Sequence, residues 1–426
     1  MAPSVIWTRL ARIGVSVPVM FEVRTITSDD AELYRRRVSR GFGGDAETDT
    51  AAAERFDAIF DYDRTLAAFD GDDIIGTGAG FSLGLTVPGG AEVPMAGTTV
   101  ITVQPTHRRR GVLRSLMERH FDDVAERGEP LAGLWASESS IYGRFGYGPA
   151  TYRSIASIGA PGLDFGSELA KGSVRLVEAD EAEPILRSVY EEARPGRAGM
   201  LTRSDAWWTH RWMSDLEAWR GGKSAHRYLL HEEDGSVTGY AIYRQNSKWE
   251  DSLADGTIDI AEVIATTSTA HSGIWSFLTS VDLFPNVEWR NMPVDDPLLF
   301  KITDPRRVRR KLADALWVRV MDIPAALSSR SYDYEGHVIF AVEDESRPEN
   351  TGTYRLEVSD GVGHCERVSG AGEVVFDIDV LGYLYLGAGD APGMAAAGRI
   401  EGAPGAVTSL HRIMRTDQQP WCPEVF

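Results

Sequence analysis

Hydrophobic and polar positions along the chain form successive blocks of strand-like and helix-like periodicity. In the first block, residues 22–26 are predicted as a short strand and residues 65–105 as adjacent β-hairpins. Apolar residues then recur at helical spacing over 112–127, and residues 131–137 follow as a short buried strand. Strands and helices mixed in this way predict an α+β domain.

The second block repeats this order of elements after a linker at 160–172 that is rich in glycine and proline. Strands are predicted between 227 and 267, and a helix is predicted at 272–281. In the first block a basic turn separates the last strand of the hairpins from the helix, and the second block lacks this turn. The pattern therefore predicts tandem domains of similar architecture, of which only the first carries the basic turn.

The third block begins near Asp304 and is predicted as a strand, a short helix and hairpins, with further strands within 372–387. These patterns divide the chain into four parts. We expect a disordered extension at 1–20, a first domain at 21–160, a second domain at 161–303 and a third domain at 304–426.

Composition narrows the class of protein. The chain has 426 residues, 43% of them apolar, with 63 acidic against 44 basic side chains and a formal charge of −19. This composition is typical of a globular protein and excludes a disordered tail or a coiled coil. A strongly anionic surface disfavours nucleic acid and anionic lipid and favours cationic small molecules. Because Arg9 and Arg12 interrupt the first apolar run and no later run is long enough, we expect neither a signal peptide nor a membrane span.

The cysteines and histidines give no sign of a metal site. Cys365 and Cys422 are isolated in the sequence, and we interpret them as structural thiols in a reducing cytoplasm. No two histidines have a metal-binding spacing, and none has the spacing of a Ser-His-Asp arrangement. We therefore expect no metal. We interpret the aromatic cluster at 206–212 as core or interface packing.

An acidic stretch runs from residue 45 to residue 73, and only Arg55 and Arg64 are basic within it. We interpret it as a solvated helix face. The alternative is that part of the stretch faces a pocket and attracts a cationic substrate. Its acidic residues are Asp45, Glu47, Asp49, Glu54, Asp57, Asp61, Asp63, Asp70, Asp72 and Asp73.

The segment richest in chemistry runs from Thr99 to Arg114, TVITVQPTHRRRGVLR. A strand ends near Pro105, and a helix opens after the three arginines. The N–H groups of a first helical turn have no intrahelical partner, and with the positive end of the helix dipole they bind anions. Gly111 lets a ligand approach the main chain. The segment predicts a diphosphate site, although a solvated basic turn has the same pattern. Neither GxGxxG nor GK[ST] is present, which disfavours a dinucleotide or a nucleoside triphosphate.

Two signatures resemble those of the GCN5-related N-acetyltransferases. Thirty residues after the basic turn, ASESSIYGRFGYGPAT resembles the second motif of that superfamily. With the tandem domains and the terminal phenylalanine, the match narrows to the Enhanced intracellular survival (Eis) acetyltransferases of actinobacteria, and it covers residues 20–426. The acetyl-CoA signature V-x-V-x-P-x-x-R-R-x-G is matched by Ile101, Val103, Pro105, Arg108, Arg109 and Gly111, with Leu113 where the family has a small residue.

The resemblance implies two GNAT-like domains, a sterol-carrier-like α/β domain at the C-terminus and a cytoplasmic homohexamer. It implies acetyl-CoA as co-substrate, Tyr142 as general acid, and the terminal carboxylate of Phe426, entering the active site from the third domain, as general base. A free backbone edge at 100–103 would bind the acetyl oxygen. The cofactor-binding residues it implies are Ile101, Thr102, Val103, Arg108, Arg109, Arg110, Gly111, Val112, Leu113, Arg114, Ser137 and Glu138.

The acceptor implied by the resemblance is an amine of a cationic, aminoglycoside-like small molecule, and lysine side chains of peptides or proteins are an alternative. Some family members carry an acidic residue beside the terminal one, whereas this chain has Val425 there and Glu424 one position earlier. A hypothesis of another class is a lipid-binding or scaffolding oligomer with a vestigial enzyme site. Retention of Gly111, Tyr142 and Phe426 argues against it.

Overall fold

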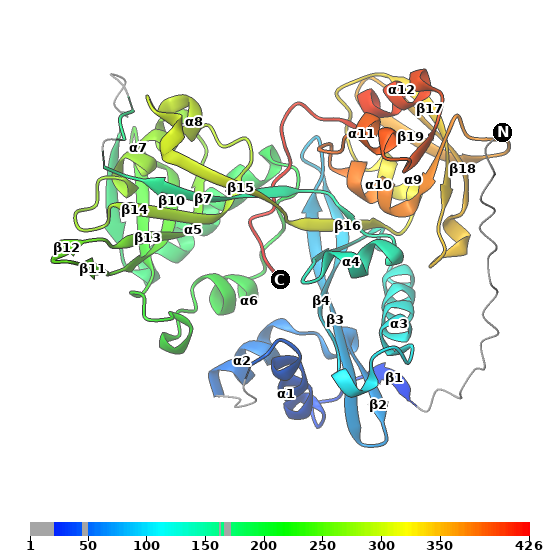
Figure 1. Ribbon diagram of the computed structural model, residues 1–426, viewed down its shortest axis with the longest axis horizontal. Helices are drawn as coiled ribbons and strands as arrows, with labels where there is room; N and C mark the ends of the chain where they lie inside the picture. The colour runs from blue at the N-terminus through cyan, green and yellow to red at the C-terminus, as the bar shows by residue number, and fades with distance from the viewer. Residues whose placement is uncertain (1–20, 45–49, 162, 166–171) are drawn as a thin grey trace, which may run out of the picture.

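The computed structural model describes residues 21–44, 50–161, 163–165 and 172–426, and the predicted extension at 1–20 lies outside them. The described chain forms three lobes, each built on a β-sheet with helices packed against it (Figure 1). This architecture confirms the predicted α+β class.

The first lobe contains a seven-stranded mixed sheet. Its strands are β1 (Glu22–Thr25), β2 (Thr65–Asp70), β3 (Asp73–Thr86), β4 (Glu92–Val103), β5 (Leu131–Trp135), β6 (Gly148–Pro149) and β16 (Leu316–Val320), in the order β1-β2-β3-β4-β5-β16-β6; its helices are α1 (Ala31–Gly41), α2 (Thr50–Ile59), α3 (Val112–Glu126) and α4 (Ser139–Tyr142). Helix α3 buries Met117, Phe121 and Val124 on one face, because helical spacing aligns them.

The second lobe contains another seven-stranded sheet. Its strands are β7 (Tyr152–Gly159), β8 (Ser173–Val177), β9 (Arg227–Glu233), β10 (Ser236–Asn246), β13 (Thr257–Ala265), β14 (Asn286–Pro293) and β15 (Val308–Asp314), in the order β15-β7-β14-β13-β10-β9-β8; β11 (Trp249–Glu250) and β12 (Leu253–Ala254) form a hairpin, and the helices are α5 (Ala179–Ala193), α6 (Asp205–Trp207), α7 (Ser268–Leu278) and α8 (Leu298–Lys301). Trp275 of α7 is fully buried against this sheet.

The two seven-stranded sheets exchange neighbouring strands. β7 belongs to the second sheet although it precedes residue 160, and β16 belongs to the first sheet although it follows residue 304. The predicted domain boundaries at 160 and 304 therefore do not coincide with the division of the strands between the two sheets. The glycine- and proline-rich stretch stands in the sequence between β7 and β8, which belong to one sheet. Hydrogen bonding in a sheet does not require strands to be adjacent in the sequence.

The third lobe contains a smaller, five-stranded sheet. Its strands are β17 (Gly336–Glu343), β18 (Gly352–Ser359), β19 (Val362–Val368), β20 (Val374–Asp377) and β21 (Ile400–Gly402), in the order β19-β18-β17-β20-β21; its helices are α9 (Ile323–Ser328), α10 (Ile378–Tyr385), α11 (Ala391–Ala396) and α12 (Pro404–Met414). The prediction of strands throughout 372–387 is wrong beyond Asp377, where α10 begins. A short, continuous apolar run is compatible with either a buried strand or a buried helix.

Two further observations concern the described residues as a whole. Their longest helices, α3 and α5, have 15 residues each, and none is long and apolar enough to cross a membrane. Cys365 and Cys422 are both buried and free of disulfides.

Candidate active site

The first sheet opens into a gap between its two central parallel strands. β4 and β5 pair only from Met95–Leu131 to Gly97–Gly133, and β4 then continues to Val103 along β3 alone. Beyond Gly97, the edge of β4 that faces the gap has no strand as a partner. Its backbone N–H groups are therefore available to a ligand that enters between the strands.

A β-bulge shapes this free edge of β4. Val100 and Ile101 together lie opposite Gly78 of β3, and Val100 has a φ of +47°, which is unusual for a β-branched residue. The hydroxyl of Thr77 donates to the carbonyl of Val100 over 2.8 Å, and the hydroxyl of Tyr34 donates to the carbonyl of Gly78 over 2.9 Å. These two side chains, which the sequence analysis did not assign to the site, hold carbonyl groups on both strands of the bulge.

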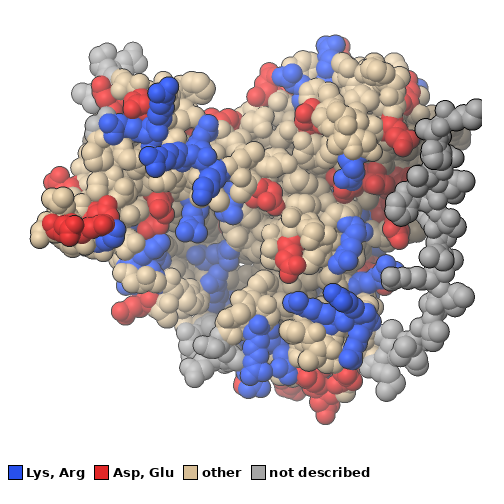
Figure 2. All heavy atoms as spheres, viewed as in Figure 1, with Lys and Arg blue, Asp and Glu red and all other residues tan. Residues whose placement is uncertain are grey.

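The loop between β4 and α3 leaves the start of a helix uncapped and open to a ligand. Gly111 precedes α3 with a φ of +89°, and α3 has no side-chain cap. The N–H groups of Val112, Leu113 and Arg114 cannot find acceptors within their own helix. A Cβ built on Gly111 would meet no protein atom within 4 Å, so the space above the loop is open to a ligand. Figure 2 shows basic side chains gathered over this start of α3, on a chain that is acidic overall.

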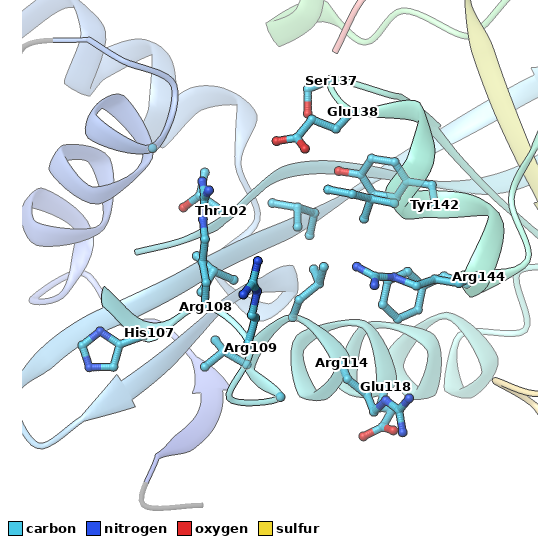
Figure 3. Close-up of a pocket in the computed structure, with 18 of the residues that line it drawn as sticks. Thr102, His107, Arg108, Arg109, Arg114, Glu118, Ser137, Glu138, Tyr142 and Arg144 are labelled. Atoms are coloured by element: carbon cyan, nitrogen blue, oxygen red, sulfur yellow. The ribbon is translucent and has the colours of Figure 1, made fainter. Parts of the chain in front are cut away.

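One cavity of about 1020 Å³ joins this loop to the gap. Of the predicted cofactor-binding residues, Arg110 alone does not line the cavity. The cavity also involves residues that the sequence analysis did not assign to the site, among them Arg144 and, from the third lobe, Glu345 and Ser346. Those that do line it are Ile101, Thr102, Val103, Arg108, Arg109, Gly111, Val112, Leu113, Arg114, Ser137 and Glu138 (Figure 3).

Tyr142 lies at the end of α4, on the wall of this cavity, and its side chain is buried. Its hydroxyl and the Glu138 carboxylate point into the same space (Figure 3). Burial raises the pKa of Tyr142 above its usual value of 10.0, a hydrogen bond from the Ser137 side chain opposes this shift, and the Glu138 charge adds to it. Tyr142 therefore holds its proton at neutral pH, as a general acid must.

A buried hydrogen-bonded group supports Tyr142 from behind. The Thr98 hydroxyl bonds to Nε2 of His120 over 2.7 Å and to the Tyr147 hydroxyl over 2.8 Å, and the Tyr147 ring lies 6.1 Å from that of Tyr142. Burial, together with the Arg64 charge, lowers the pKa of His120 to about 4, so this histidine is neutral at neutral pH. The sequence signal for the group is weak, because a histidine on the apolar face of a helix is also common in ordinary cores.

Phe426 lies on the opposite face of β4 from Tyr142. A Cβ on Gly97 would come within 3.2 Å of the Phe426 ring, at the last residue before β4 and β5 separate. The next residue, Thr98, points to the face that carries Tyr147, because successive strand residues face opposite sides. The chain end therefore meets the gap from one face and Tyr142 meets it from the other. Figure 1 shows the tail running between the lobes to this point.

The tail is held by a buried ion pair. Glu424 is 1% exposed, pairs with Arg203, and accepts hydrogen bonds from the indole N–H groups of Trp207 and Trp212. Arg203 also pairs with Glu262 of the second sheet. Glu424 is therefore committed to an anchoring role and is not available to a substrate. The aromatic cluster at 206–212 packs in the core, as predicted, and it also binds the tail.

The acidic stretch does not line the cavity where the structure describes it. Asp57, for example, is exposed, accepts a hydrogen bond from Tyr62 over 2.7 Å and lies 3.6 Å from Arg35. Asp45, Glu47 and Asp49 lie outside the described residues. Within 21–44, 50–161, 163–165 and 172–426, no group of three or more His, Cys, Asp or Glu side chains is placed to hold a metal ion.

Comparisons with known proteins agree with this architecture. Residues 22–150 and 199–320 each match a model described as an acetyltransferase (GNAT) domain, and residues 323–423 match a sterol carrier protein domain. An uncharacterised N-acetyltransferase of Streptomyces avermitilis is 37% identical over 409 residues, which cover 95% of this chain and 99% of the relative. The N-acetyltransferase Eis of Mycobacterium tuberculosis is 36% identical over 354 residues, which cover 79% of this chain and 84% of that protein.

A solved structure shows the same three-lobed arrangement. Eis1 from Mycobacterium abscessus superposes with a TM-score of 0.83 at 31% identity, covering 95% of this chain and 100% of the other. The predicted sterol-carrier-like third domain is thereby confirmed, as are the two GNAT domains. On these similarities, the chain belongs to the Eis family of GCN5-related N-acetyltransferases and is an N-acetyltransferase.

Proposed function

We propose that this enzyme transfers the acetyl group of acetyl-CoA directly to a primary amine, in the gap between β4 and β5. The observation that carries the proposal is the arrangement around this gap, because the cavity with Tyr142 lies on one face of β4 and Phe426 lies on the other. A gap open to both faces lets a donor and an acceptor meet without sharing one pocket.

The residues of the cavity fit acetyl-CoA, the co-substrate that the GNAT fold implies. Uncapped N–H groups at the start of α3, with Arg108 and Arg109, suit a diphosphate. The open space above Gly111 leaves room for it. When bound, acetyl-CoA supplies the acetyl group in an activated, thioester form.

The residues around the gap divide the acid–base chemistry between them. The free N–H groups of β4 beyond Gly97 can donate to an acyl oxygen. Tyr142 holds the proton that a departing sulfur needs. The carboxylate at the end of residue 426 is the proposed base, since a carboxylate of pKa about 3.5 is ionised at neutral pH and can accept a proton from the acceptor amine through water.

For the acceptor, we propose a cationic, aminoglycoside-like amine, supported by the net charge of −19 and by the proposed terminal carboxylate. A lysine side chain of a peptide is the second candidate, and Arg211 favours it. Among the described residues this guanidinium has no acidic hydrogen-bonding partner, it lies 5.2 Å from the ring centre of Trp207, and burial lowers its pKa to about 10. A fixed positive charge near the tail disfavours a polycation more than a singly charged lysine.

We further propose a homohexamer in the cytoplasm. Support for assembly comes from large apolar side chains on the described surface, such as Phe300, Leu253 and Leu312 at 89%, 73% and 70% exposure. Support for the compartment comes from the two free, buried cysteines and from the use of acetyl-CoA. Light scattering should give a mass near six times 46.8 kDa.

The experiment that tests the proposal is a screen of purified protein with acetyl-CoA, a thiol-detecting dye and matched amines. The panel contains aminoglycosides, a lysine-containing peptide and the same peptide with the lysine side chain blocked. Release of CoA with the aminoglycosides or the free peptide, and not with the blocked peptide, is expected. Calorimetry that detects no acetyl-CoA binding at high micromolar concentration would instead support the lipid-binding or scaffolding hypothesis with a vestigial site.

A further inference from the structure

Residues 199–202 form a direct link between the second lobe and the first sheet. They run alongside β3 and exchange backbone hydrogen bonds of 2.8 and 2.9 Å with it on both sides of Leu85. Earlier in the same strand, Phe81 pairs with Gly97, the residue that lies beside the chain end. Arg203 follows the link directly, so its backbone is held at a fixed offset from the gap between β4 and β5.

The side chain of Arg203 is fully buried. Its guanidinium pairs with two carboxylates, that of Glu262 in β13 and that of Glu424 in the tail. Three aromatic rings also surround it, with centres at 3.6, 4.6 and 4.1 Å: Tyr190, Trp208 and Trp212. A buried charge is costly unless its partners stay in place. Arg203 therefore has one favourable position, and Glu424 is held there with it.

The tail is closely fixed up to Glu424. Before this residue, the N–H of Trp421 donates to the carbonyl of Ala198 over 2.8 Å, and the Asn291 side chain donates to two tail carbonyls over 3.0 and 3.1 Å. Phe426 follows Glu424 by two positions, and two extended residues span at most about 7 Å. While Glu424 stays paired, the carboxylate of residue 426 is thus confined to a small volume beside the gap.

We infer that Arg203 is a positioning residue for acetyl transfer: it holds Glu424 and thereby sets the place of the Phe426 carboxylate at the gap between β4 and β5. The second GNAT domain then has a function in the reaction of the first, as the receptor for the tail. Arg203 does not line the cavity beside Tyr142, so it acts through the tail and not through the donor. This inference rests on the proposed role of the Phe426 carboxylate as the base.

The two cysteines of the chain allow the position of the tail to be measured apart from the fold. Cys422 lies in the tail, Cys365 lies in β19 of the third lobe, and both are buried. A thiol reagent modifies thiols that become accessible, so in the full, unsubstituted chain both should react slowly. Arg203→Met leaves two buried carboxylates without a cation. Cys422 should therefore react at least about a hundredfold faster, while Cys365 reacts at its original rate.

Turnover of the same proteins measures the effect on catalysis. With the amine that the unsubstituted protein acetylates fastest, Arg203→Met should lower kcat by about a hundredfold, and acetyl-CoA affinity should stay within about twofold. Arg203→Lys keeps the charge but lacks the fork that reaches two carboxylates. Cys422 labelling and kcat should each change by only about tenfold in this variant. A loss of kcat that follows the exposure of Cys422 is not expected from a purely structural role.

Arg244→Met is the matched control. Arg244, in β10 of the same lobe, is half-buried and pairs with Asp215 over 2.6 Å. The substitution removes an ion-paired arginine from the same sheet and leaves the pair with the tail in place. Cys422 labelling and kcat should therefore remain unchanged, even if the melting temperature falls. Equal effects of Arg244→Met and Arg203→Met would contradict the inference.

The outcomes separate this inference from the proposed function. If Cys422 stays protected in Arg203→Met, Arg203 does not hold the tail, and the inference is overturned while the proposed base stands. If Cys422 becomes accessible at unchanged kcat, the tail positions no catalytic group, and the proposed base is wrong as well. If both cysteines react quickly, the variant is unfolded and Glu424→Gln replaces it. That variant keeps the pair with Glu262, and it should speed Cys422 labelling and lower kcat by about tenfold each.

Discussion

The first and second lobes have similar sheets and differ in the loop that connects a central strand to the helix after it. In both, a central parallel pair, β4–β5 or β13–β14, is flanked by a strand taken from another part of the chain, β16 or β7. In the first lobe, eight residues from Gln104 to Gly111 connect β4 to α3 and leave the helix uncapped. In the second, Thr266 and Thr267 alone connect β13 to α7.

The short link closes the anion site in the second lobe. The Thr267 side chain accepts a hydrogen bond from the N–H of Ala270 over 3.0 Å, which occupies a donor that the first lobe leaves open. Helices α3 and α7 thus have the same position in the fold, but the N-terminus of α3 has no side-chain cap and that of α7 has one. The GNAT fold alone therefore does not leave a helix N-terminus open to a ligand; the length and capping of one loop differ between the two lobes.

The tail adds a second difference between the lobes. In the second lobe, β13 and β14 pair no further than Ile260 and Trp289. Beyond this point the tail accepts a hydrogen bond from Asn291 of β14, and Arg203 links Glu424 of the tail to Glu262 of β13. In the first lobe it ends beside Gly97, where β4 and β5 separate. One gap is thus occupied by the protein's own chain, and the other is left open to ligands.

The largest expected effect comes from closing the anion site of the first lobe. Gly111→Asp should lower the affinity for acetyl-CoA by at least about a hundredfold, because it places a negative charge in the anion site and a Cβ at a φ of +89°. Gly128, at the other end of α3, has a φ of +69° and equally open surroundings, so Gly128→Asp is a matched control for charge and strain. Calorimetry that finds similar losses in both variants would contradict the assignment.

Lengthening the tail tests whether the first gap needs a free chain end. Adding a few residues after Phe426 converts the terminal carboxylate to an amide, and turnover should fall by about a hundredfold or more. Acetyl-CoA affinity should stay within about twofold, because Phe426 lies outside the cavity. The melting transition must be measured in parallel, since Trp421 and Glu424 anchor the tail in the core. A folded, extended protein that acetylates amines at the original rate would exclude the terminal base.

Tyr142→Phe tests the acid on the other face of the gap. The change removes one oxygen and should lower kcat by about a hundredfold while leaving acetyl-CoA affinity nearly intact, because a general acid acts in the transition state. Burial raises the pKa of Tyr142 above 10.0, so the group stays protonated and kcat should not decline through it between pH 7 and 9. If turnover is unchanged in a steady-state assay, Tyr142 serves packing alone.

The sequence predicts those features of the structure that depend on residues close together in the chain, and it does not predict features that depend on distant residues. The basic loop and the helix after it follow from local spacing, and the structure shows them where the sequence indicated. The exchange of β7 and β16 could not be predicted in this way, because each strand pairs with residues more than a hundred positions distant or across a domain boundary. The cavity beside Tyr142 shows the same limit, since Ser346 lines it from the third lobe.

The smallest expected effect concerns the capped helix of the second lobe. Thr267→Ala removes the cap of α7 and should lower the free energy of unfolding by about 1 kcal/mol, measured by denaturant titration. Removing the cap frees one donor but adds neither the long loop nor the arginines, and the tail still occupies the neighbouring gap. Calorimetry should therefore give one CoA per chain for the variant, as for the unsubstituted protein. A second site appearing in Thr267→Ala would show that capping alone separates the two lobes, and that loop length and the tail have no part in it.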